Sequence, residues 1–181
     1  MAIDKICESF EAAVSGIKDG STILVSGFGG AGMPTELLNA LREQGASDLT
    51  IVSNNAGVGK EGIGGLLLDG RVRKVICSYP RSGGSVVFEE MWAAGKVDLE
   101  VVPQGTLSER IRAAGAGIGG FYTPTGVGTQ LAEGKEVREI NGRLQVLEAP
   151  LKGDVAFILA RRSDRWGNLI YNKSARNFGP V

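Results

Sequence analysis

The strongest constraint on the fold is a strand, a glycine-rich turn and a helix start that follow one another in DGSTILVSGFGGAGMP, from Asp19 to Pro34. The β-prone run at residues 22–25 leads into four glycines within six residues, and Pro34 marks a helix start behind them. Glycine reaches backbone angles closed to other residues, and without a Cβ it lets a ligand lie against the main chain. Such a turn before the exposed N–H groups of a helix suits a phosphate, a carboxylate or a polarised carbonyl. The segment therefore predicts a site for an anionic or acyl ligand.

Three of these glycines also match the dinucleotide-binding pattern G-x-G-x-x-G. That pattern requires an acidic residue about 20 positions further on, at the end of the second strand, to bind the ribose. The corresponding run, residues 49–53, is followed by Asn54 and Asn55 instead. A nicotinamide-dependent redox role is therefore the weaker interpretation of the loop and stays open as an alternative.

Length and composition are typical of a compact enzyme domain. The chain has 181 residues, and its 20 basic and 20 acidic side chains cancel. Balanced charge provides no basic surface for nucleic acid or an acidic membrane. Apolar runs such as residues 155–160 are too short to span a bilayer, and the N-terminus lacks the apolar stretch of a signal peptide. We expect one domain over residues 1–181, a cytoplasmic location, and no nucleic-acid or membrane partner.

The missing residue types exclude several chemistries. The chain contains no histidine, so it cannot by itself form a Ser-His-Asp or Cys-His catalytic arrangement or the commonest zinc sites. Its two cysteines, Cys7 and Cys77, form no C-x-x-C pair. Because free cysteine is usually buried, we expect both thiols in the core, with neither a metal site nor a disulfide.

Hydrophobic periodicity predicts an α/β fold, with a mostly parallel sheet covered by helices on both faces. An apolar stripe predicts a helix over residues 3–17, and Gly45 is expected to end a second helix that contains Leu37, Leu38 and Leu41. Asn141-Gly142 between alternating apolar residues predicts a β-hairpin insertion in the C-terminal part. The remaining predicted elements are a helix at 86–94 and strands at 22–26, 49–53, 74–78, 99–102, 155–159 and 169–171.

Polar motifs follow several of the predicted strands. The glycine loop, Asn54-Asn55 and Gln104 come after different strands, whose carboxyl ends meet at one edge of a parallel sheet. Amides donate hydrogen bonds to negative charge that develops on a thioester or anhydride oxygen, but they are poor nucleophiles and bases. This pattern predicts half of an active site. The alternative is that the asparagines form a turn or helix cap and that Gln104 only satisfies loop backbone.

Four segments, in order, resemble the first (A) subunit of the family I coenzyme A transferases. They are the glycine-rich block itself, SNNAG at 53–57, VPQGTLSERIRAAGAGIGGFYTPTGVGT at 102–129, and DRWGNL…SARNFGP at 164–180. The resemblance covers the chain from about Asp19 to its last residue and implies a CoA-transferase-like fold. First subunits of the family usually continue beyond the position of Val181, so we expect the C-terminus to be truncated.

The resemblance also implies a mechanism. In that family the second (B) subunit supplies a glutamate that attacks the acyl-CoA thioester, an enzyme–CoA thioester forms, and a second carboxylic acid collects the CoA. The chain would thus work only with a B subunit, as a heterodimer or heterotetramer, with CoA entering as acyl-CoA substrate and no permanently bound cofactor. Glu61, in KEGIGG, is similar to the nucleophile motif but follows SNNAG, so its position belongs to the first-subunit pattern.

Residue assignments follow from the same resemblance. It assigns Asn54, Asn55 and Gln104 as oxyanion and substrate contacts. The CoA-binding loop would comprise Ser26, Gly27, Phe28, Gly29, Gly30, Ala31 and Gly32.

Three short motifs bear on the identity of the acid that receives CoA. SYPR, RWGN and FGP resemble members of the family that act on 3-oxoadipate more than those that act on acetoacetate. We expect Arg81 to bind the distal carboxylate of a dicarboxylic 3-oxo acid, because arginine binds carboxylates bidentately. The alternatives are an exposed arginine without this role, an acetoacetate-type transferase, and a domain that binds CoA or an acyl ligand without turnover. Arg161, Arg162 and Arg165 could contact a phosphate or form a solvated basic turn.

Overall fold

The computed structural model describes residues 3–181, apart from the side chains of Ser174 and Ala175. Contacts divide the chain into two compact units. The first comprises the chain up to Glu100 together with Gly153–Pro180, and the second comprises Val101–Lys152 and Val181. A single domain over the whole chain stays a prediction, and each unit is described by itself.

The first unit contains a five-stranded sheet in the order β4-β3-β2-β1-β8. Strand β1 pairs in parallel with both β2 and β8, and β2 pairs in parallel with β3. The Asp154 carboxylate fixes the approach of β8, because it accepts a 2.7 Å hydrogen bond from Thr22 N at the start of β1. The strands are β1 Thr22–Val25, β2 Leu49–Asn55, β3 Val72–Tyr79, β4 Asp98–Val101 and β8 Val155–Phe157. The mostly parallel α/β class is confirmed.

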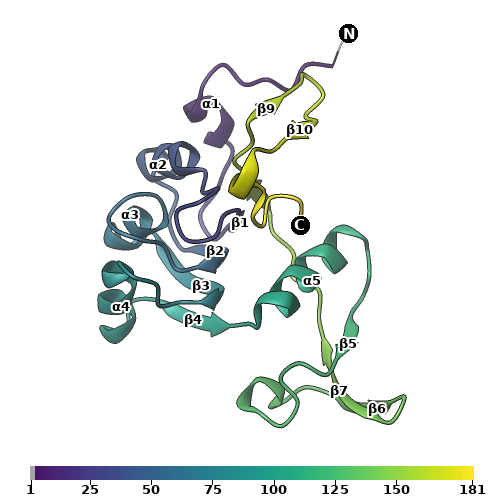
Figure 1. The fold of residues 1–181 in the computed structure, drawn as a ribbon. Helices are drawn as coiled ribbons and strands as arrows, with labels where there is room; N and C mark the ends of the chain where they lie inside the picture. The colour runs from purple at the N-terminus through teal and green to yellow at the C-terminus, as the bar shows by residue number, and fades with distance from the viewer. Residues whose placement is uncertain (1–2) are drawn as a thin grey trace. The chain divides into compact units, whose positions relative to one another are not determined.

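Four helices of the first unit lie along its sheet (Figure 1): α1 Phe10–Val14, α2 Thr35–Gln44, α3 Ile63–Leu68 and α4 Val86–Ala93. Alternate strand residues such as Ile51 and Cys77 form one buried cluster with Leu38 and Leu41 of α2 and with apolar residues of α3 and α4. Gly45 ends α2 as predicted, with φ 96° and its N–H bound to Leu41 O. The sequence did not indicate α3, because two of its six residues are glycines that disfavour a helix.

The predicted helix over residues 3–17 is wrong for most of its length. Helix α1 has only five residues, because the Ser9 hydroxyl accepts a hydrogen bond from Ala12 N and caps the helix there. The preceding segment is not helical, and the side chains of its stripe are exposed: Ile3 by 62% and Ile6 by 66%. Lys5 N donates to Arg165 O, which joins this segment to the C-terminal hairpin of β9 Arg162–Ser163 and β10 Leu169–Ile170.

The two cysteines differ in burial. Cys77 lies on β3 inside the core, as expected, and burial raises the pKa of its thiol to about 12. The expectation for Cys7 is wrong: its thiol is exposed, because the segment before Ser9 does not pack as a helix.

A thiol reagent added to the native protein at pH 8 should therefore modify Cys7 and leave Cys77 unmodified. The reactive form is the thiolate, and the raised pKa of Cys77 keeps its thiol protonated while packing excludes the reagent. Titration with a chromogenic disulfide should show one reactive thiol before denaturant is added and two afterwards. Two reactive thiols in the folded protein would contradict the buried position of Cys77.

The second unit contains α5 Gln104–Gly115, the 3-10 helix η1 Gln130–Ala132 and an antiparallel sheet in the order β5-β7-β6. Its strands are β5 Phe121–Thr123, β6 Val137–Ile140 and β7 Arg143–Glu148. The predicted hairpin joins β6 to β7, with Asn141 and Gly142 at φ 52° and 73°, as a tight two-residue turn requires. The Glu148 carboxylate is buried and accepts a 2.7 Å hydrogen bond from Lys135 Nζ.

Candidate functional site

The glycine loop between β1 and α2 forms a tight turn. Phe28 and Ala31 exchange two backbone hydrogen bonds, of 2.9 and 3.1 Å, which leaves Gly29 and Gly30 at the tip. Gly27 has φ 111°, a backbone conformation that residues with a Cβ rarely adopt. The N–H groups of Gly29 and Gly30 donate no hydrogen bond to any of the described residues. Two backbone donors are therefore available to a ligand at the tip.

Ser26 fastens this loop to the sheet. Its buried hydroxyl donates to Gly32 O at 2.8 Å and accepts from Leu159 N at 3.2 Å, just beyond β8. Gly27 N adds a 2.8 Å bond to Asn177 O. Because both hydrogen-bonding roles of the hydroxyl are used inside the fold, Ser26 stabilises the loop, a contribution that the sequence did not indicate.

Asn55 connects the end of β2 to the glycine loop. Its Nδ2 donates to Gly29 O at 3.3 Å, and its Oδ1 accepts from Gly57 N at 2.9 Å. The side chain is 1% exposed, and both ends of its amide have partners. The structure thus brings together two of the motifs that the sequence placed at strand ends.

Asn54 is bound differently. Its Oδ1 accepts a 2.7 Å hydrogen bond from Ser78 Oγ on β3, and the same hydroxyl lies 3.1 Å from Asn54 O. Within residues 3–181, no hydrogen bond is formed by Asn54 Nδ2, although Asn54 is only 2% exposed. One end of this amide is held by the protein and the donor end is available. Ser78 is the first residue of SYPR, a motif that did not itself indicate a contact between this hydroxyl and Asn54.

Arg81 lies on the loop that follows β3. Ser85 Oγ donates to Gly57 O at 2.8 Å, and Gly59 N donates to Gly84 O at 2.9 Å, so this loop is tied to the loop after β2. The Arg81 side chain is 69% exposed, with its Nε 3.7 Å from Glu89 Oε1. An ion pair that exposed contributes little, which leaves the guanidinium able to bind a carboxylate.

Two further candidates lie elsewhere in the chain. Gln104 is the first residue of α5 in the second unit, where it is exposed. Glu61 is exposed just before α3 and lines a surface hollow with Asn39, Arg42, Glu43 and Asp69.

Among the described residues, no three His, Cys, Asp or Glu side chains cluster so as to hold a metal ion. The described part of the chain also contains no helix long and apolar enough to cross a membrane.

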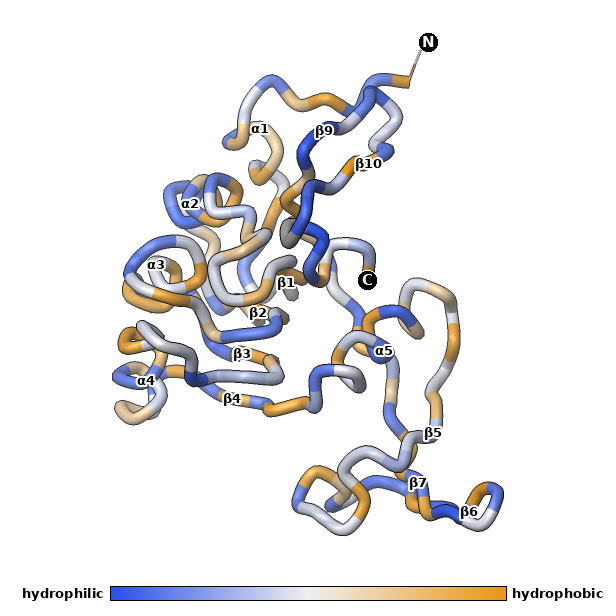
Figure 2. The backbone as a smooth tube through the Cα atoms, in the orientation of Figure 1, coloured by the Kyte–Doolittle hydropathy of each residue, from blue (hydrophilic) through white to orange (hydrophobic). Residues whose placement is uncertain are grey.

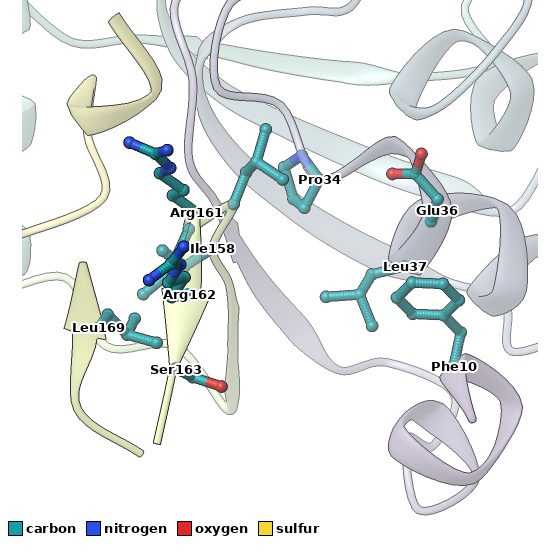
Figure 3. A pocket seen from close by; sticks show the side chains of 11 residues that line it. Phe10, Pro34, Glu36, Leu37, Ile158, Arg161, Arg162, Ser163 and Leu169 are labelled. Atoms are coloured by element: carbon teal, nitrogen blue, oxygen red, sulfur yellow. The ribbon is translucent and has the colours of Figure 1, made fainter. Parts of the chain in front are cut away.

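A separate cavity of about 370 Å³ lies in the first unit (Figure 3). Phe10 and Leu37 lie on one side, and Arg161, Arg162 and Leu169 lie on the other. Figure 2 shows the segment around β9 as hydrophilic. None of the amides at the strand ends lines this cavity, and a phosphate contact for its two arginines stays a prediction.

Comparison with known proteins identifies the family. A family model described as "Coenzyme A transferase" matches residues 7–181. The chain belongs to the coenzyme A transferase family. It is 63% identical over 179 residues to the A subunit of 3-oxoadipate CoA-transferase from Pseudomonas putida, a match that covers 99% of this chain and 78% of the relative. It is 50% identical over 177 residues to the A subunit of a probable succinyl-CoA:3-ketoacid coenzyme A transferase from Bacillus subtilis, covering 98% of this chain and 74% of the relative.

Solved structures support the fold of this coenzyme A transferase chain. An acyl-CoA transferase from Escherichia coli O157:H7 matches with a TM-score of 0.81 and 24% identity, over 94% of this chain and 37% of the other. Glutaconate coenzyme A-transferase from Acidaminococcus fermentans matches with a TM-score of 0.77 and 20% identity, over 93% of this chain and 61% of the other. The relatives make this chain an A-type subunit of a coenzyme A transferase, an enzyme that uses CoA substrates.

Proposed function

We propose that this chain is the A subunit of a heteromeric 3-oxoacid CoA-transferase that moves CoA from succinyl-CoA to 3-oxoadipate. One structural observation carries the proposal: the unpaired Asn54 amide nitrogen lies on a strand end whose next residue, Asn55, is bonded to the glycine loop. Relatives from Pseudomonas putida and Acinetobacter baylyi, at 63% and 56% identity, are both named as A subunits of 3-oxoadipate CoA-transferase, which supports the choice of acid.

The reaction would proceed by two half-reactions, each made of two acyl transfers. First, the thioester carbonyl of succinyl-CoA is attacked by a glutamate carboxylate of the partner subunit, and the CoA thiolate leaves to give an acyl–glutamyl anhydride. The thiolate then attacks the glutamyl carbonyl, which releases succinate and forms a glutamyl-CoA thioester. The 3-oxoadipate carboxylate reverses these steps and leaves as 3-oxoadipyl-CoA, which gives ping-pong kinetics.

Each step passes through a tetrahedral intermediate whose oxygen carries negative charge. Asn54 Nδ2 and the N–H groups at the tip of the glycine loop are the donors that this chain offers to such an oxygen. Residues 27–32 would contact the acyl-CoA, Ser26 and Asn55 would hold that loop in place, and Gln104 would add a substrate contact. The chain would contribute the groups that stabilise the oxyanion, and its partner subunit would contribute the nucleophile. The two subunits would form a heterodimer or heterotetramer.

The test is to co-express this chain with its B subunit, purify the complex and incubate it with succinyl-CoA alone. Intact mass spectrometry should find the CoA thioester on the partner chain and none on this chain. Addition of 3-oxoadipate should then yield 3-oxoadipyl-CoA, and neither chain by itself should catalyse transfer. A CoA adduct on this chain, for example at Glu61, would overturn the division of roles.

Replacing Arg81 with leucine should raise the Michaelis constant for 3-oxoadipate about 10-fold or more and leave that for acetoacetate unchanged. The reason is the loss of a charge-assisted hydrogen bond to the distal carboxylate, an interaction that contributes about 1.5–3 kcal/mol. Steady-state kinetics with both acids measure the effect. The exposed Arg143 on β7 provides a matched control, because its replacement with leucine should change neither constant. Equal effects of the Arg81 substitution on both acids would contradict the assignment.

The second candidate is a transferase specific for acetoacetate. The Bacillus subtilis relative, at 50% identity, is named for a 3-ketoacid, a class that includes both acetoacetate and 3-oxoadipate, so its name does not favour this second candidate. Transfer to acetoacetate without transfer to 3-oxoadipate would select it. Tight binding of CoA by the complex without any turnover would instead favour a binding domain.

A further inference from the structure

Asn54 and Ser78 form a cross-strand pair in the parallel sheet. The register pairs Ser53 with Cys77 and Asn55 with Tyr79, so Asn54 and Ser78 lie opposite each other between these pairs. Side chains alternate along a strand, which places both on the sheet face opposite to Cys77 and the helix-covered core. Their contact is therefore set by the sheet itself, without a flexible loop.

In this structure the contact holds the oxygen end of the Asn54 amide. An asparagine side chain can rotate by half a turn and present either its oxygen or its nitrogen to a neighbour. Here the Ser78 hydroxyl binds Oδ1 at 2.7 Å, so the oxygen is turned toward β3 and Nδ2 is the end left for a ligand. An amide oxygen facing a developing oxyanion would repel it, whereas the nitrogen stabilises it.

The neighbouring asparagine shows that this arrangement is particular to Asn54. Both ends of the Asn55 amide bind main-chain groups, Gly57 N and Gly29 O, at 2.9 and 3.3 Å. Two consecutive amides of the same type thus serve different purposes, with Asn55 joining two loops and Asn54 presenting a donor. Ser78 is the only described side chain that hydrogen-bonds the Asn54 amide.

We propose that Ser78 is a positioning residue for transfer, which holds Asn54 Oδ1 so that Nδ2 donates to the oxyanion. This rests on the proposed function, in which Asn54 stabilises the tetrahedral intermediates. Ser78 itself touches no substrate. Its effect passes through Asn54, appears in the turnover number, and requires a hydroxyl at this position.

A double-mutant cycle in the complex with the B subunit tests this. Asn54→Ala should lower kcat by about 100-fold, as for loss of one oxyanion donor. Ser78→Ala should lower kcat by about 10-fold, which is the size of effect seen when a residue that only orients another functional side chain is removed. It should change KM by less than about 2-fold. Ser78→Thr, which keeps the hydroxyl, should restore kcat. The double variant should match Asn54→Ala within about 2-fold, because a group acting only through Asn54 has no effect in its absence.

Thermal unfolding of each variant controls for stability. Ser15→Ala is the matched control, since it also removes a hydroxyl that donates to a main-chain oxygen, at 2.9 Å from Ala12 O. It should leave kcat unchanged. If Ser78→Ala folds poorly, Ser78→Cys replaces it and should give a smaller loss of kcat than alanine is expected to give.

Two results distinguish a failure of the positioning role of Ser78 from a failure of the oxyanion role of Asn54. An unchanged kcat for the Ser78 variant, or losses that multiply in the double variant, overturns the positioning role and leaves the role of Asn54 intact. An unchanged kcat for Asn54→Ala overturns the oxyanion role of Asn54, and with it the inference for Ser78.

Discussion

Gly27→Ala should disrupt the glycine loop and abolish most of the transfer activity. A Cβ on Gly27 would lie 2.9 Å from Met33 N and 3.1 Å from Gly32 C, both main-chain atoms that cannot rotate away. The residue also has φ 111°, and a side chain in such a conformation costs about 1–3 kcal/mol. With the overlap added, we expect the free energy of unfolding to fall by about 2–5 kcal/mol. Urea unfolding followed by tryptophan fluorescence measures this loss.

Gly30 provides the matched control in the same loop. A Cβ there would meet nothing within 4 Å, and the residue is outside the left-handed region. Gly30→Ala should therefore leave the free energy of unfolding within about 0.5 kcal/mol of the original protein. Because its N–H lies at the tip where we place the acyl-CoA, the methyl group should still raise the Michaelis constant for succinyl-CoA. A stable Gly30→Ala protein with an unchanged constant would show that the acyl-CoA lies elsewhere.

Gly64→Ala should destabilise the protein by about 2–3 kcal/mol, even though alanine is the better helix former. Gly64 lies within α3, and a Cβ there would overlap the Gly59 carbonyl oxygen and come within 3.1 Å of Gly59 C. That oxygen belongs to the loop that runs from the end of β2 to α3. The intrinsic gain of up to about 1 kcal/mol from alanine is smaller than the cost of moving this loop.

Gly115→Ala is the control for that substitution, because Gly115 ends α5 and has open space around its Cβ position. It should leave stability unchanged or raise it slightly, as measured by the same urea titration. If both alanine variants stabilised the protein, the close approach of α3 to the Gly59 carbonyl would be excluded.

Features of the fold that depend on a few neighbouring residues could be predicted from the sequence. Gly45 ends α2 and Asn141-Gly142 turns the hairpin because each conformation requires those residue types locally. The buried strands β2 and β3 were recognisable as short apolar runs. By contrast, α3 was hidden by two glycines that close packing requires, and close packing cannot be read from a local pattern.

The N-terminal stripe shows the opposite error. Ile3 and Ile6 have helical spacing with Phe10, but spacing stabilises a helix only where a surface covers the apolar face, and these side chains are exposed. Only part of the candidate site could be predicted from the sequence. Strand-end positions singled out Asn54 and Asn55, whereas their different bonding depends on Ser78 and Gly29, residues distant in sequence that only the sheet brings close.

The position of β8 has a consequence for the order in which the protein is made. The bond between Thr22 N and the Asp154 carboxylate joins residues 132 positions apart, and the whole of Val101–Lys152 is synthesised between them. During translation, β1 can pair with β2 early, but its other edge stays open until β8 has left the ribosome. An open strand edge is a template for pairing with other chains, so slow elongation through the second unit prolongs the period of greatest aggregation risk. Residues 101–152 are therefore synthesised before β8, the strand that closes the open edge of β1.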